Sequence, residues 1–322
     1  MKHSLLLGAS VLAMVAAFAV DVAPAAAADM PVVIEPVAPT PVLGHRFAGT
    51  VTAGVMWTRD QRDFSGGFDD DDDDDDDDIN WRSFFGEAAV LIGPAGTNWN
   101  FQGDFSFHSH RTDDLFFSDQ VALDAWHFGG IAFWRDANVG LVGVDASFIS
   151  NDFNGTIETG RIGLRGEYFV GQSITVGGGA GYVSMDFFGK SDGDGFDANL
   201  WGRYYFNDSF AVKVRGDVGS ISLEDAPVDD VTAWAIAGEG EYLLPSLPMS
   251  IFGGVRYAQA DVNTFSDYTV DSLQVYAGAK FYFGSGDAGT SLATHHRNNT
   301  LDNTSTFLER IPFSIFGMGG KV

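Results

Sequence analysis

Asp104, His108 and His110 lie at even spacings in one polar stretch of the sequence. In an extended strand such spacings place side chains on the same face. A carboxylate beside imidazoles is a combination that general acid–base hydrolysis uses. The alternative is a polar lining of a cavity, which the sequence favours because the chain carries no catalytic motif. We therefore expect a protein that is not an enzyme.

An uninterrupted run of aspartates is the most acidic feature of a chain whose net charge is −26. Adjacent carboxylates repel one another and cannot pack, so the run predicts an extended, solvated loop. Weak Ca²⁺ or Mg²⁺ binding is one reading, because hard cations take oxygen ligands. A loop without a defined ligand is the favoured reading, so no resident cofactor is expected. The run comprises Asp69, Asp70, Asp71, Asp72, Asp73, Asp74, Asp75, Asp76, Asp77 and Asp78.

Further aspartates cluster in what we expect to be the other long loops. The segment from Asp192 to Asp197 has carboxylates at alternate positions separated by glycines, as in a fragment of a calcium loop, but it lacks the downstream bidentate Glu. Together these loops predict an acidic rim that concentrates cations and repels anions. No other residue pattern in the sequence is assigned as a set of metal ligands.

The strands that position these residues are predicted from a hydropathy pattern that repeats every two residues. Between Phe47 and Phe283 the chain has twelve stretches of alternating apolar and polar residues, separated by gaps that are alternately short and long. Short turns on one side and long loops on the other are typical of a transmembrane, antiparallel, up-and-down β-barrel. We predict an all-β fold with twelve strands, ten or fourteen being the alternatives. The short gaps are 93–98, 136–138, 170–172, 207–209 and 244–248.

Charged residues within the predicted strands share one parity, which assigns them to the lumen. Opposite charges across a pore would produce a transverse field that favours polar solutes. A barrel of about 8 strands is filled by its side chains and one of about 16 is open, so both a narrow channel and a filled barrel remain for twelve. The predicted lining residues are Asp104, His108, Arg161, Arg165, Glu167, Arg203, Lys213, Arg215, Asp217, Glu239, Glu241, Arg256 and Lys280.

The chain ends suggest export. A short basic start, an apolar run and Ala26-Ala27-Ala28 predict a cleaved secretory signal over 1–28. A Pro-rich segment over 29–45, a barrel over 46–283 and a tail over 284–322 follow. We expect both mature ends in the periplasm. The chain contains no Cys, which excludes disulfides and thiolate chemistry.

The last predicted strand, from Tyr276 through Gly278 and Phe281 to Phe283, resembles the terminal-strand signal read by the outer-membrane barrel-assembly machinery, although 39 residues follow it here. With the Ala-rich leader and Gly-rich strands, the chain resembles alphaproteobacterial outer-membrane β-barrel and porin-like proteins. The resemblance covers about 45–283 and is one of architecture.

That resemblance implies a bacterial outer-membrane location. The implied partners are membrane lipid, lipopolysaccharide, the assembly machinery and small polar solutes, with no nucleic acid. We expect a narrow porin-like channel for passive diffusion with an acidic outer rim. A non-conducting structural or surface-contact barrel is the alternative, and a hydrolase at the barrel rim is the third hypothesis.

Overall fold

The computed structural model describes residues 46–64, 79–94, 96–112, 121–152, 156–187, 189, 191–223, 228–264, 268–284 and 291–302. The expected signal peptide, the Pro-rich segment, the aspartate run and the residues after 302 lie outside these ranges. What the sequence predicts for them stays a prediction.

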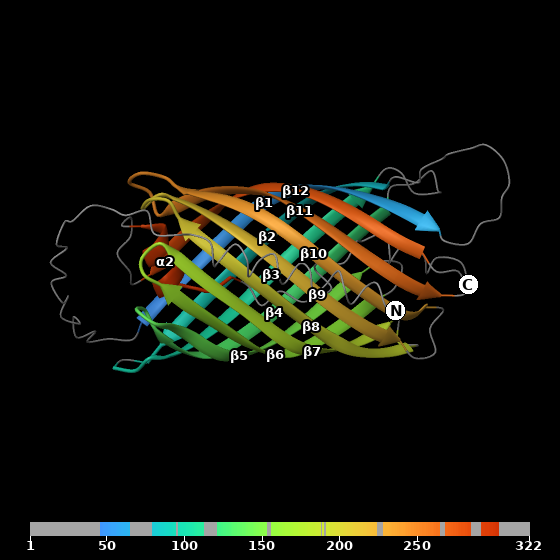
Figure 1. Ribbon diagram of the computed structural model, residues 1–322, viewed down its shortest axis with the longest axis horizontal. Helices are drawn as coiled ribbons and strands as arrows, with labels where there is room; N and C mark the ends of the chain where they lie inside the picture. Colours follow the sequence, from blue (N-terminus) through green and yellow to red (C-terminus); the bar gives the residue numbers. More distant parts are fainter. Residues whose placement is uncertain are drawn as a thin grey trace, which may run out of the picture.

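Twelve strands form one closed antiparallel barrel, in which each strand pairs with its neighbours in sequence and β1 pairs with β12 (Figure 1). The predicted fold class is therefore confirmed. The strands are β1 (Arg46–Phe64), β2 (Ile79–Gly93), β3 (Trp99–Thr112), β4 (Val121–Asp136), β5 (Gly140–Asp152), β6 (Thr156–Val170), β7 (Ile174–Phe187), β8 (Ser191–Tyr205), β9 (Phe210–Leu223), β10 (Val228–Leu243), β11 (Met249–Thr264) and β12 (Tyr268–Gly284).

Alternation of side chains across each strand builds the two faces of the barrel. In β3, Trp99 and Phe101 are each 53% exposed, whereas Asn100 and Gln102 are 1% and 3% exposed. Polar groups thus face the interior and apolar groups face outward, the reverse of a soluble barrel. A continuous exposed apolar band of this kind needs an apolar environment. Other exposed apolar side chains include Val55, Trp57, Phe84, Trp126, Phe128, Val142, Ile162, Leu164, Tyr168, Phe196 and Phe281.

Short turns join the strands at one end, at 94–98, 137–139, 171–173, 206–209 and 244–248, as predicted. Gly140 follows one of these turns with φ +150°, and a Cβ there would lie 2.1 Å from the carbonyl oxygen of Glu167. Only glycine allows the chain to enter β5 so close to β6. We call this end of the barrel the short-turn end. At the other end only the gaps 65–78 and 113–120 are longer, whereas 153–155, 188–190, 224–227 and 265–267 are equally short, so the predicted alternation of short and long gaps was only partly right.

The strands extend further than the sequence predicted. Asp192 to Asp197, expected in a long loop, belong to β8. Alternation puts Asp192 and Asp194 on the exposed face and Asp197 inside, so these carboxylates do not surround one point as calcium ligands would. The reason is that a membrane sets only a minimum strand length of about 9–11 residues, and ladder hydrogen bonding continues beyond it.

The interior changes character along the barrel axis. Toward the end opposite the short-turn end, here called the long-loop end because it carries the longest gap, 65–78, inward-facing apolar side chains from β6, β7, β9, β10, β11 and β12 form one cluster. At the short-turn end lies α2 (Leu292–Asn298), and the described residues contain no helix with the length and apolar character to cross a membrane (Figure 1). The apolar cluster consists of Ile157, Val183, Met185, Ile221, Val231, Ala233, Ala260, Val262, Tyr268 and Val270.

Candidate functional site

Residues 291–302, here called the inner segment, lie inside the lumen at the short-turn end. The hydroxyl of Ser291 accepts a hydrogen bond from the backbone N–H of Thr294 and caps the start of α2. Leu292 is fully buried, and its backbone N–H donates to the carbonyl oxygen of Asp208 at 2.7 Å. The segment is therefore anchored where it enters the barrel.

Polar contacts of the inner segment reach most of the barrel wall. Hydrogen bonds and ion pairs join it to β1, β3, β4, β6, β7, β8, β9, β10 and β12. Contacts on opposite sides of a closed barrel mean that the segment spans the lumen. It divides the short-turn end from the rest of the interior.

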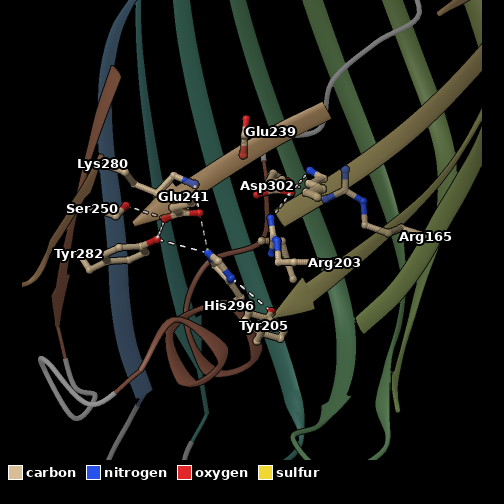
Figure 2. Close-up of polar contacts among 12 residues, drawn as sticks. Arg165, Arg203, Tyr205, Glu239, Glu241, Ser250, Lys280, Tyr282, His296 and Asp302 are labelled. Atoms are coloured by element: carbon tan, nitrogen blue, oxygen red, sulfur yellow. Dashed lines mark hydrogen bonds and ion pairs between the residues drawn. The ribbon is translucent and has the colours of Figure 1, made fainter. Parts of the chain in front are cut away.

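His296 connects α2 to a buried carboxylate on β10. Its Nε2 lies 3.0 Å from Oε2 of Glu241, and its Nδ1 lies 3.2 Å from the hydroxyl of Tyr205 (Figure 2). Burial, with Arg203 nearby, lowers the pKa of His296 to about 4, so the ring is neutral near pH 7. We assign the Nε2–H tautomer, which donates to Glu241 and accepts from Tyr205.

Glu241 also collects contacts from the barrel itself. Its Oε1 accepts hydrogen bonds from the hydroxyls of Ser250 and Tyr282, each at 2.5 Å, and Nζ of Lys280 lies 3.9 Å from Oε2. A buried carboxylate needs several hydrogen-bond donors and a nearby positive charge to offset the loss of water. The inner segment contributes one of its four partners, through His296.

Asp302 supplies a second charged anchor at the end of the inner segment. Its Oδ2 lies 2.5 Å from Nζ of Lys213 and 3.3 Å from a guanidinium nitrogen of Arg203. Arg165 donates to its backbone carbonyl oxygen at 2.7 Å. Although burial opposes ionisation, Lys213 and Arg203 hold the pKa of Asp302 well below its usual value. The carboxylate is therefore ionised across the physiological pH range.

Backbone groups of the inner segment are held by wall side chains. Gln102 donates to the carbonyl oxygen of Leu301 and accepts from its N–H, at 3.1 and 2.7 Å. Arg135 donates to the carbonyl oxygen of Asn299 at 2.7 Å. Arg297 points the other way and donates to wall carbonyl oxygens at 2.7 and 2.8 Å. The contacts of Gln102 and Arg135 satisfy backbone groups that follow the helix, and those of Arg297 satisfy carbonyl oxygens in and beside the 171–173 turn.

On the side of the inner segment that faces away from the short-turn end, the lumen holds a chamber of about 260 Å³. His296, Leu301 and Asp302 are among the residues that line it, and they form its floor at the short-turn side. Both charge signs line the chamber, together with aromatic rings. Its wall includes Glu87, His108, Lys213, Arg215, Glu239, Phe252, Arg256, Tyr276 and Lys280.

The structure turns the side chains of the predicted lining residues inward but pairs several of them locally. Arg161 contacts both Asp145 and Asp197, and Arg215 lies 2.8 Å from Asp217. The structure gathers others around the inner segment, namely Arg165, Arg203, Lys213, Glu241 and Lys280. Glu167 lines a small cavity with Arg203, His296 and Asp302. The others lie elsewhere in the lumen: His108, Glu239 and Arg256 line the chamber, and Asp104 is buried beside His127.

Of the residues considered for hydrolysis, His108 and His110 stack with ring centroids 6.0 Å apart, whereas Asp104 faces a different histidine. Asp104 lies 3.7 Å from His127, while Nδ1 of His110 lies 2.6 Å from the hydroxyl of Ser83. His110 and Ser83 are 1% and 7% exposed, so a substrate has no access to that pair. Among the described residues no cluster of His, Asp or Glu is arranged to hold a metal ion.

Sequence reasoning missed the inner segment, which it assigned to a periplasmic tail. The available signals were Ser291 as a helix cap and the mixed polar residues that follow, which match a polar lumen. The residues concerned are His295, His296, Arg297, Asn299 and Asp302.

Neither a known protein family nor a curated protein matches the sequence. Solved structures do match the fold. An outer membrane channel from Pseudomonas putida F1 is 8% identical, with 73% of this chain and 96% of that chain covered and a TM-score of 0.51. The beta domain of the Bordetella autotransporter BrkA is 8% identical, with coverage of 73% and 100% and a TM-score of 0.43. At these identities the likeness concerns architecture alone, and the chain shares the closed antiparallel barrel fold of the bacterial outer-membrane channel.

Proposed function

We propose that the protein is a bacterial outer-membrane channel for small hydrophilic solutes, closed at its short-turn end by the inner segment. The observation that carries this proposal is the polar chamber of about 260 Å³ with a floor made by a noncovalently held piece of the same chain. The outward apolar band supports a membrane location. Passive diffusion then requires the inner segment to withdraw.

The proposed orientation places the short-turn end in the periplasm, as in outer-membrane barrels generally. The aspartate run, 69–78, would then lie outside the cell and attract cations. Deleting it should reduce cation preference at low salt, with the difference vanishing at high salt because of screening. Protease added to intact cells should cut this loop. Cutting only after the outer membrane is permeabilised would reverse the orientation.

A non-conducting structural barrel is the second candidate. It is favoured by the contacts of the inner segment with most of the wall, and by the apolar cluster toward the long-loop end. The rim-hydrolase hypothesis has no comparable support, because Asp104 and His110 have different partners.

Planar-bilayer conductance separates the two candidates. The hydroxyl oxygens of Thr300 and Thr50 lie 3.0 Å apart, and the chain has no Cys. A Thr50→Cys/Thr300→Cys variant therefore offers a single disulfide that ties the inner segment to β1. We expect discrete conductance steps after reduction and their loss after oxidation, while either single variant is insensitive to redox state.

The wild-type chain sets the baseline of that experiment. If neither it nor the reduced variant conducts, the structural role is favoured. Steps that persist through the oxidised disulfide would show that the inner segment is not the closure.

A further inference from the structure

Two buried cations face each other across neighbouring strands. Arg203 on β8 and Lys213 on β9 are directly paired in the ladder, and their side chains are 6% and 13% exposed. Like charges directly opposite each other destabilise a sheet, and buried charges need a partner of opposite sign. This pair therefore creates a requirement for an anion in the lumen.

Asp302 meets that requirement from within the chain. Its carboxylate contacts both cations, and Arg165 on β6 donates to the backbone of the same residue. Figure 2 shows Arg203, Arg165 and Asp302 converging from the wall and the inner segment. Glu239 lies opposite Lys213 on its other side and adds negative charge there, and it also accepts a hydrogen bond from Tyr276 at 3.2 Å. Asp302 is nevertheless the carboxylate with ion pairs to both cations. The shared counter-ion of the pair is Asp302.

The wall holds the two cations in place. The ring of Trp201 on β8 lies 5.5 Å from the guanidinium carbon of Arg203 and 5.3 Å from Nζ of Lys213. Contacts at these distances orient cations on the ring face. The site is thus part of the barrel, whereas its present occupant belongs to a segment held by noncovalent contacts.

The occupant is also within reach of the chamber. The side chain of Asp302 is 33% exposed, and both Asp302 and Lys213 line the chamber. A solute in the chamber can therefore approach the carboxylate and the cation that it neutralises.

We propose that Arg203 and Lys213 form a binding site for the carboxylate group of a small solute, and that Asp302 occupies this site in competition with it. The proposal adds a carboxylate-bearing solute to the small hydrophilic solutes of the proposed function and in that respect rests on it. The proposed acidic rim disfavours entry of such a solute, so selectivity for it comes from the buried cations and not from the rim. A solute that binds only when Asp302 has left shifts the inner segment toward withdrawal by mass action. Solute binding and opening are then coupled.

Titration calorimetry on the full chain, folded in detergent, tests the site with succinate as the probe. Asp302→Asn removes the competing charge and leaves the cations, so it should bind succinate at least about tenfold more tightly than wild type, the range expected for charge-assisted hydrogen bonds. Adding Lys213→Met should abolish that gain. Asp192→Asn, on the exposed face of β8, removes the same charge away from the lumen and should behave as wild type.

Equal affinities in wild type and Asp302→Asn would overturn the proposal, as would chloride at matched ionic strength giving the same heat as succinate. Heat-modifiable gel mobility checks folding. If Asp302→Asn does not fold, Lys213→Met in the wild-type chain carries the test and should weaken succinate binding. Calorimetry needs no ion flow, so a barrel that binds succinate but never conducts overturns the channel alone.

Discussion

Leu301 provides apolar contacts that hold the inner segment against the barrel wall. It is 4% exposed and packs in a buried cluster with wall residues that include Ala48, Leu91 and Phe133. When the segment withdraws, this side chain moves from that cluster into water. Leu301→Ala therefore weakens the docked state relative to the withdrawn state, and it leaves the charged anchors unchanged.

The size of the effect follows from three removed carbon atoms. At ~0.8 kcal/mol for each buried carbon, the docked state loses ~2.4 kcal/mol. That corresponds to roughly fiftyfold more of the withdrawn state, since about 1.4 kcal/mol is a factor of ten. The cavity left behind adds to this loss, so the value is a lower bound.

Amide hydrogen exchange followed by mass spectrometry measures the effect directly. Peptides covering 291–302 should exchange roughly fiftyfold faster in Leu301→Ala, while strand peptides keep their protection. Leu247→Ala is the matched control, because Leu247 is 49% exposed in a turn at the same end. An increase below about threefold in Leu301→Ala would refute the reasoning, because the withdrawn state would then not expose Leu301.

Two further predictions concern acid and lipid. Docking of the inner segment should weaken as the pH falls from about 6.5, the ordinary pKa of His, toward about 4, the pKa of docked His296. The opening equilibrium constant of 291–302, obtained from amide exchange after division by the intrinsic rate at each pH, should rise by up to roughly tenfold per pH unit in that window, and His296→Gln should flatten the profile. Ile162→Arg, on the outer face where Ile162 is 63% exposed, should lower stability in liposomes by ~2–4 kcal/mol. Glu158→Arg on the same strand and face, near the long-loop end, is its control, and equal losses from both would contradict a lipid-facing band at Ile162.

The barrel was predictable because every strand residue has only two choices of face. The alternation in β3 from Trp99 to His110 is a local pattern, and so are the short gaps such as 171–173. Strand ends were not predictable to the same degree. Asp192 and Asp197 look like loop residues by composition, but cross-strand hydrogen bonding with β7 and β9 keeps them in the sheet.

No local sequence pattern predicts that the inner segment lies in the lumen. Parity places Gln102 inside, but its partner Leu301 is 199 residues away in the sequence. Likewise, parity places Arg203 and Lys213 on the inner face, and their register implies an unmet need for an anion. Sequence alone does not say that Asp302 supplies it.

The spread of the inner segment's contacts over the wall has a consequence for biogenesis. Thr300 contacts β1, Asp302 contacts β8 and β9, and His296 contacts β10 and β12. No partial sheet presents all these partners, so full docking waits until β12 has paired with β1. The docked segment is thus a marker of completed closure. During assembly, protection of 291–302 from protease would report the moment at which the sheet becomes a cylinder.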